Sequence, residues 1–254
     1  MLGLAVGCAL VRPPGPPLEP RVLLAGLEER RDSLQTLSLS GRGSLTAKGR
    51  TLRGSFTIYA ARPGSLRLET YGPFGIPVLF VVAQGGQVKA VNFLERRYFF
   101  GPASAPKMAA FLPLNLSAAE LIALLSAAPL PEEPTVVRAV APNQAPRLQM
   151  AAKTGGDALV LLEGERGPVR LLFDGEARLA AASWGEGPQE LVALYSDWRP
   201  CEGAAAFPFD LDFSLPSRGR ALSLEASEVR LNEPAPPEAF ELAPPEGFKI
   251  IEVN

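Results

Sequence analysis

Asp210 and Asp212 are the two side chains whose types and spacing suggest acid–base chemistry. They lie two residues apart in a strand-like run, so both carboxylates fall on one face of the strand. Paired carboxylates are the groups that hydrolyse glycosidic bonds. The same spacing is that of a solvated strand face opposite Phe209, Leu211 and Phe213. We favour this second interpretation, because no other catalytic group accompanies the pair.

The rest of the sequence gives little support for catalysis. It contains no histidine, which removes the commonest general base and metal ligand. Residues 41–43 lack the third glycine of a dinucleotide-binding fingerprint, and there is no P-loop or nucleophile elbow. Trp184 and Trp198 are interpreted as core or sheet-face aromatics, with a sugar-binding platform as the alternative. We therefore expect a protein that is not an enzyme and uses no cofactor.

Cys8 is the residue at which the sequence does indicate a chemistry. The only other cysteine, Cys201, is too distant for a CxxC metal site and is interpreted as an unpaired structural thiol. Apolar and small residues precede Cys8, as in the lipobox where bacterial lipoproteins are cleaved and lipid-modified. No basic residue comes before it, and the apolar run is short for a secretion signal. An inert thiol in an apolar N-terminus is the alternative.

The segment after Cys8 is consistent with an anchor. Five of the ten residues 11–20 are proline, which predicts an extended spacer. No apolar run reaches the roughly 18 residues of a membrane-spanning helix. We predict a truncated lipoprotein signal, an anchor cysteine and a spacer over residues 1–20. Residues 21–254 then form one domain, attached to a membrane by lipid.

Composition favours a β-rich domain without nucleic acid. The 26 prolines and 24 glycines suit many short strands joined by turns. The net charge of −2, with no basic stripe, argues against a nucleic-acid partner.

Periodicity predicts strands on both sides of a helical interruption. Helices are expected at residues 21–37, 103–112 and 117–127, the last with a capping box of Ser117 and Glu120. Strands are expected at residues 38–45, 53–61, 66–69, 78–83, 87–94, 97–100, 135–141, 147–152, 158–163, 169–173, 178–184, 190–198, 207–215, 221–231 and 248–253. About eleven or more strands cannot stay flat, so they predict a single large curved antiparallel sheet. Helices would plug its concave face, leaving an apolar cavity.

The turn at residues 72–77 reads Gly-Pro-Phe-Gly-Ile-Pro. Glycine and proline are expected there, because a turn needs fixed or positive φ values. Phe74 and Ile76 are not expected, because a short turn offers little to bury them. Loop tips carry function more often than core positions do. Phe74 therefore either folds back into the core or is displayed to something outside the protein.

The order of these features resembles the LolB family of outer-membrane lipoproteins, which receive other lipoproteins and insert them into the membrane. The resemblance runs over most of residues 21–254 and rests on order and spacing. It is carried by Cys8, residues 66–68, 72–75, 96–98 and 111–116, and the helix over residues 121–125. Residues 207–208, 229–232 and 240–244 are also similar to related LolA/LolB-like lipoproteins. Phenylalanine stands at position 74, where the family has leucine.

The resemblance implies a half-barrel of about eleven strands whose cavity takes the acyl chains of a client lipoprotein. It implies that the turn, over Pro73, Phe74, Gly75 and Ile76, is a hook that faces the membrane. Candidate cavity residues are Phe56, Ile58, Leu66, Leu68, Leu121, Ile122 and Leu125.

The function expected from the resemblance is acceptance of lipoproteins, or of their acyl chains, and help in inserting them into the outer membrane. The protein would be a monomer on the periplasmic side, supplied by a LolA-like carrier. A lipid-binding or lipid-sensing lipoprotein without insertase activity is the alternative, followed by a structural lipoprotein with a filled core.

Overall fold

The fold is built from one sheet and three short helices in a computed structural model, which describes residues 19–47, 49–131, 137–140, 145, 148, 152, 158–164, 167–202, 204–236 and 238–253. The helices are α1 (Pro20–Ser33), α2 (Ala105–Met108) and α3 (Ala118–Leu125). The strands are β1 (Thr36–Ala47), β2 (Arg50–Ala61), β3 (Ser65–Tyr71), β4 (Pro77–Gln84), β5 (Gln87–Asn92), β6 (Arg97–Pro102), β7 (Val137–Val140), β8 (Ala158–Gly164), β9 (Gly167–Phe173), β10 (Leu179–Trp184), β11 (Leu191–Cys201), β12 (Ala204–Leu215), β13 (Arg220–Leu231) and β14 (Lys249–Glu252). Short 3-10 turns are η1 (Pro73–Gly75), η3 (Gly187–Gln189) and η4 (Pro216–Arg218).

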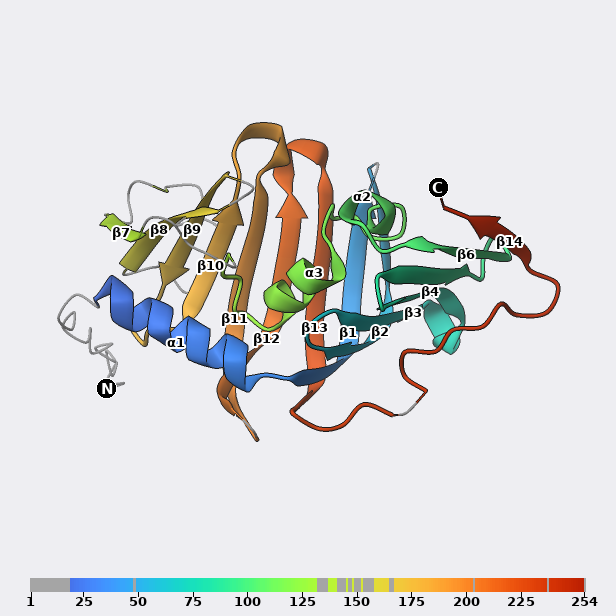
Figure 1. The fold of residues 1–254 in the computed structure, drawn as a ribbon, viewed down its shortest axis with the longest axis horizontal. Helices are drawn as coiled ribbons and strands as arrows, with labels where there is room; N and C mark the ends of the chain where they lie inside the picture. The colour runs from blue at the N-terminus through green and yellow to red at the C-terminus, as the bar shows by residue number, and fades with distance from the viewer. Residues whose placement is uncertain are drawn as a thin grey trace, which may run out of the picture.

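All the described strands belong to one 14-stranded sheet, in the order β14-β6-β5-β4-β3-β2-β1-β13-β12-β11-β10-β9-β8-β7 (Figure 1). The predicted class, a mainly β protein with one curved sheet, is confirmed. The 14 strands agree with the expected eleven or more, but the pairing is not antiparallel throughout. Strand β14 runs parallel to β6, because the chain returns to that edge through the long segment after β13 instead of through a hairpin.

The helices lie on the same side of the sheet (Figure 1), which we call the inner face. Alternate strand residues point to this face and form one core with apolar residues of all three helices, including Leu24 of α1, Met108 of α2 and Leu125 of α3. Helix α3 has the predicted capping box, in which Ser117 Oγ accepts from the Glu120 backbone N–H at 3.2 Å. Helices α1 and α2 are shorter than predicted.

Arg30 fastens α1 to the end of α3 and to β12. Its Nε donates to the Ser126 carbonyl at 2.7 Å and its Nη1 to the Ala206 carbonyl at 2.8 Å. The guanidinium also lies 5.2 Å from the Trp198 ring centroid and 5.3 Å from that of Phe207. Burial lowers the pKa of Arg30 to about 10. These contacts satisfy a carbonyl that the end of α3 leaves without a helical partner.

The outer face of the sheet is also covered in two places. Leu159, Leu172 and Ala181 form a second core with Ala145 and Leu148, so β8–β10 are buried on both faces. This explains why those strands read as nearly continuous apolar runs. Leu148, where a strand was expected, is helical; the remaining described residue of that segment, Ala152, is not in a strand. At the other end of the sheet, the segment after β13 packs on β3 through Ala239.

Gly41 and Gly43 weaken the strand prediction for β1, but the strand is continuous. The β1–β13 register shifts between Ser40 and Gly41. A Cβ on Gly41 would collide with the Glu225 carbonyl oxygen. Glycine at this bulge therefore lets two strands approach closely.

We predict that Gly41→Ala lowers the free energy of unfolding by about 1–3 kcal/mol, because the new methyl group must displace the β13 backbone. Gly26→Ala is the matched control, since a Cβ on Gly26 in α1 has no neighbour within 4 Å. It should stabilise the protein by about 0.5–1 kcal/mol. Urea unfolding measures both; an equal effect of the two substitutions would contradict the interpretation of Gly41.

Candidate functional site

The loop at residues 72–76 displays its apolar side chains. Phe74 is 101% exposed and Ile76 is 57% exposed, so the alternative in which Phe74 folds back into the core is wrong. Phe74 has φ 61° and ψ 21°, the left-handed region that bulky residues seldom occupy. The loop closes on itself, with Gly72 N–H donating to the Ile76 carbonyl at 2.8 Å. A large apolar side chain is thus held in solvent at a cost in backbone strain.

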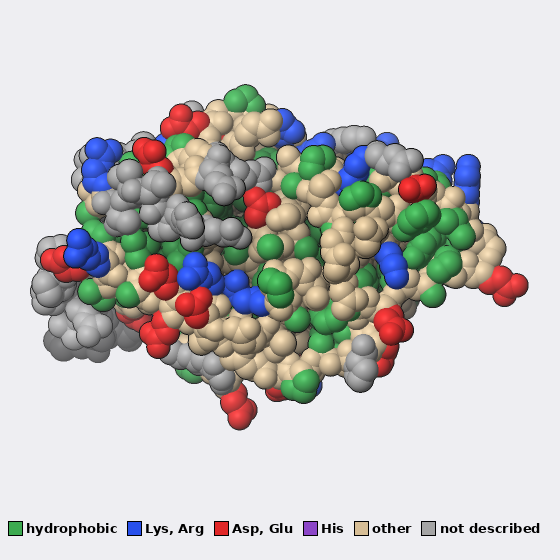
Figure 2. Space-filling view, in the orientation of Figure 1, with side chains coloured by type: hydrophobic (Ala, Val, Ile, Leu, Met, Phe, Trp, Pro, Cys, Tyr) green, Lys and Arg blue, Asp and Glu red, His purple; other side chains and the backbone are tan. Residues whose placement is uncertain are grey.

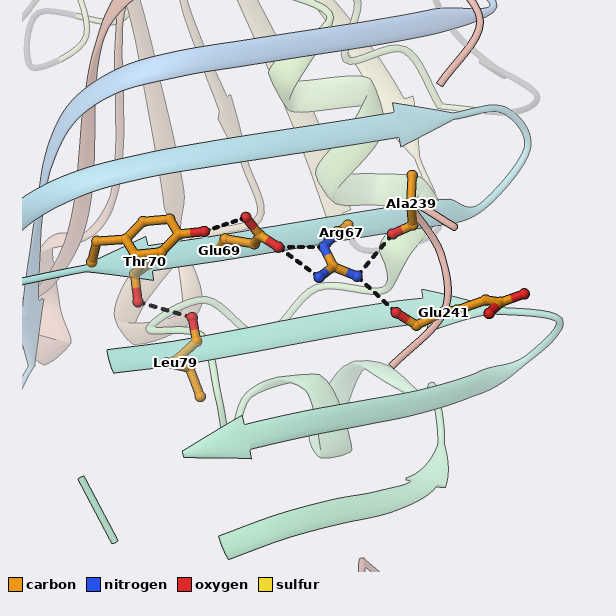
Figure 3. A network of polar contacts seen from close by, with 7 residues as sticks. Arg67, Glu69, Thr70, Leu79, Ala239 and Glu241 are labelled. Atoms are coloured by element: carbon orange, nitrogen blue, oxygen red, sulfur yellow. Dashed lines mark hydrogen bonds and ion pairs between the residues drawn. The ribbon is translucent and has the colours of Figure 1, made fainter. Parts of the chain in front are cut away.

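The base of this loop is fixed by a polar network on β3 (Figure 3). Tyr71, the last residue of β3, donates its hydroxyl to Glu69 Oε2 at 2.6 Å. Arg67 Nε donates to Glu69 Oε1 at 2.6 Å. Arg67 Nη1 also donates to the carbonyls of Ala239 at 3.1 Å and Glu241 at 2.8 Å. The strand that enters the loop is therefore tied to the C-terminal segment.

A row of aromatic rings extends from the same point across the neighbouring strands. Tyr71 meets Phe80 of β4 edge-on at 5.3 Å between ring centroids. Phe80 meets Phe93 at 4.9 Å, and Phe93 meets Phe248 at 5.8 Å. Gly54 of β2 completes the base, because a Cβ there would collide with the Tyr71 carbonyl. The loop thus projects from a rigid support.

The seven candidate cavity residues are brought together, but as packed core. One core contains Phe56 and Ile58 of β2, Leu66 and Leu68 of β3, and Leu121, Ile122 and Leu125 of α3, and α3 contacts β3. None is more than 4% exposed. None lines the pocket described next. Their part in holding an acyl chain stays a prediction.

A pocket of about 680 Å³ lies along the other face of α3. Its volume is within the roughly 300–1,000 Å³ of ligand pockets. Figure 2 shows basic side chains gathered on this side of the molecule, between α1 and α3. The described residues that line the pocket are Arg31, Arg62, Pro63, Asn115, Leu116, Ala119, Glu120, Ala123, Leu124, Pro129, Leu130, Trp184, Gly185, Glu186, Gln189, Leu191 and Leu215.

The walls of the pocket combine a long apolar surface with charged groups. Ala119 and Ala123 of α3 are small, which leaves space above the helix. Trp184 and Leu191 flank the turn between β10 and β11 and supply larger apolar surfaces. The polar groups include two arginines and two glutamates. A pocket that combines apolar surface with charged groups suits an amphiphile, whose chain and head need one of each.

The other sequence candidates lie outside these two sites, except Trp184. Asp210 and Asp212 occupy the strand face opposite the buried Phe209, Leu211 and Phe213, as favoured. Trp198 packs beneath Arg30. Cys201 is a free thiol whose pKa is raised chiefly by burial. Within the part of the chain that the structure describes, no group of three or more metal-binding side chains occurs. Cys8 lies outside the described residues.

Sequence reasoning missed most of the pocket. Ala119 and Ala123 were not among the candidate cavity residues. Two signals were available: Trp184 immediately before a Gly-rich turn, and Leu130 between two prolines after α3. Neither signal indicates which face of α3 these two residues would contact, because that depends on how the helix docks on the sheet.

None of the described helices is long and apolar enough to cross a membrane.

Comparison with solved structures identifies the fold. A DUF1329 family protein from Desulfovibrio piger superposes with a TM-score of 0.56 at 14% identity, covering 87% of this chain and 95% of that chain. A LolA superfamily protein from Nitrosomonas europaea gives 0.56 at 12% identity, covering 89% and 98%. A protein domain from Vibrio parahaemolyticus, described as outer membrane lipoprotein-sorting, gives 0.55 at 8% identity, covering 87% and 97%. No protein-family model and no curated protein matches the sequence.

The chain therefore shares its fold with these three solved structures, one of them a LolA superfamily protein. This confirms the LolA/LolB-like fold that the resemblance implied. The narrower likeness to the LolB family stays a prediction.

We predict that Phe74→Gly raises the free energy of unfolding by about 1 kcal/mol relative to Phe74→Ala. Both substitutions remove the exposed ring, but only glycine relieves the left-handed strain at φ 61°. Urea unfolding of the two variants measures the difference. Equal stabilities would show that the loop relaxes and holds no strain.

We also predict that Tyr71 makes the free energy of unfolding fall more steeply as the pH rises into the alkaline range. Burial, and then the hydrogen bond to Glu69, raise the pKa of Tyr71 to about 12 from 10.0. Its contribution is therefore complete below pH 10 and is lost as the pH rises through 12. Tyr71→Phe should make the fall in unfolding free energy between these two pH values shallower. Parallel curves for the variant and the wild type would refute this role.

Proposed function

We propose that this protein binds the acyl chains of lipoproteins, or of other lipids, and helps to transfer them into a membrane. The observation that carries the proposal is the loop at residues 72–76, which holds a fully exposed Phe74 in a strained conformation on a rigid base. Nothing within the described fold benefits from this arrangement. It is understandable if the side chain is buried by something outside the protein.

A lipid bilayer is the partner that the loop fits best. Transfer of a phenylalanine side chain from water to an apolar phase is worth about 1.5–3 kcal/mol. Ile76, exposed beside it, adds to the same contact. Such an energy gives reversible contact and no permanent insertion, which suits a protein that visits an acceptor membrane.

The pocket along α3 supports the proposal that the protein binds an acyl chain. Burial of a methylene group is worth about 0.8 kcal/mol in an apolar pocket or in a bilayer. The free energy of an acyl chain is therefore similar in the two environments. A transfer protein needs this balance, because it must accept the chain and then release it. No cofactor or catalytic group is required for such an exchange.

The remaining assignments rest on the resemblance. We propose that the protein is an outer-membrane lipoprotein anchored through Cys8, facing the periplasm, monomeric and not an enzyme. A LolA-like carrier would supply its clients. The likeness of fold to a lipoprotein-sorting domain supports an envelope setting.

The alternative is a lipid-binding or lipid-sensing envelope lipoprotein without insertase activity. One observation favours it: the seven candidate cavity residues fill the core, and the pocket of about 680 Å³ suits one amphiphile better than the several chains of a lipoprotein. A third possibility, a structural lipoprotein with no cavity, is disfavoured by the pocket itself.

We predict that Phe74→Glu weakens binding of the protein to phospholipid vesicles by about 10-fold or more, because it replaces the apolar contact with a charge. Phe74→Leu should keep most of the binding. Co-sedimentation with vesicles measures both.

Val22→Glu is the matched control, because Val22 is 62% exposed but lies on α1, away from the loop. It should bind vesicles as the wild type does. If Phe74→Glu binds as well as Val22→Glu, the loop is not the membrane contact. Insertion of a client lipoprotein, assayed with the same variants, separates an insertase from a passive lipid binder.

A further inference from the structure

One end of the pocket carries a positive charge that lacks a full set of partners. Arg62, in the turn between β2 and β3, lines the pocket. Its Nε donates to the Leu34 carbonyl at 3.1 Å, but its Nη2 is buried without a hydrogen-bond partner among the residues that the structure describes. Arg31 lines the same pocket. A buried guanidinium N–H without an acceptor is costly, so this site is incomplete as it stands.

The carboxylates of the pocket do not neutralise Arg62. Glu186 is paired with Arg170 at 3.0 Å. Glu120 Oε2 accepts from the Ser117 backbone N–H at 2.7 Å, as part of the helix cap. Both are thus engaged by other groups, and neither forms an ion pair with Arg62 among the described residues.

The surroundings of Arg62 disfavour its charge. Burial first, and then the nearby charge of Arg31, lower the pKa of Arg62. Asp32 acts in the opposite direction but is already paired with Arg31 at 2.9 Å. An anion bound beside the part of Arg62 that lines the pocket would offset the repulsion between the two arginines.

We propose that the pocket binds a single-chain amphiphile whose anionic head, a carboxylate or a phosphate monoester, pairs with the guanidinium of Arg62. The chain would lie along the apolar wall formed by Ala119, Ala123, Leu130 and Trp184. The acyl part of this inference rests on the proposed function; the choice of an anionic head does not. The planar guanidinium suits both oxyanions, since each presents two oxygens to its N–H groups.

The test uses Trp184 as the reporter. The probes are 9,10-dibromostearate, whose bromines quench a tryptophan that they contact, and its methyl ester, which has the same chain without the charge. The full chain has two tryptophans, so Trp184→Phe assigns the quenching to the pocket. We expect the acid to bind at least about 10-fold more tightly than the ester.

Arg62→Gln should reduce the affinity for the acid to that for the ester and leave the ester unchanged. Arg97→Gln is the matched control, because Arg97 is an exposed arginine of β6 that is paired with Glu95. Arg62→Lys should keep a preference for the acid. Thermal unfolding checks that each variant is folded. If a variant fails to fold, the comparison of acid with ester in the wild type still tests the proposal.

The outcomes separate this inference from the proposed function. Equal affinity for acid and ester overturns the anionic head but leaves acyl binding intact. Failure of both probes to quench overturns both proposals. Competition by lysophosphatidate, stronger or weaker than that by oleate, shows whether a phosphate or a carboxylate head is preferred. Competition by inorganic phosphate as strong as that by oleate would show a simple anion site and overturn the amphiphile.

Discussion

The pairing of β1 with β13 is the interaction on which the whole fold depends. It joins residues from Leu37 opposite Leu231 to Thr46 opposite Ala221, across nearly the full length of the chain. Without it, β1–β6 with β14 and β7–β13 would be two separate sheets, each with a new exposed edge. The close approach at Gly41 is part of this seam. A contact between segments so far apart in the chain must repay the entropy of closing a long loop.

When β1 and β13 are paired, the sheet has two faces whose apolar residues must be buried by few other elements. The inner face receives α1, α2 and α3, with Arg30 and Tyr195 holding the end of α3 through carbonyl oxygens. The outer face is covered only in part, by the Leu148 region at one end and by the C-terminal segment at the other. Because three short helices cannot fill the whole inner face, a pocket remains beside α3.

Local patterns in the sequence predicted much of this architecture. The capping box of Ser117, the alternation in β2 and the turn at Phe74 each depend on neighbouring residues, so they were visible without tertiary information. The parallel pairing of β14 and the pocket wall at Trp184 depend on residues far apart in the chain. The exposure of Phe74 could be posed from the sequence only as a choice. The structure resolves it, because Phe74 is fully exposed.

Strand β3 connects the two candidate sites, because its alternating side chains serve different faces. Leu66 and Leu68 point inward and pack beneath α3, whose opposite side borders the pocket. Arg67, Glu69 and Tyr71 point to the other face and support the loop that displays Phe74. A substitution within β3 would therefore disturb both sites through one strand. The proposed membrane contact and the proposed ligand binding are therefore best separated by substitutions at their far ends, at the tip of the loop and at the charged end of the pocket.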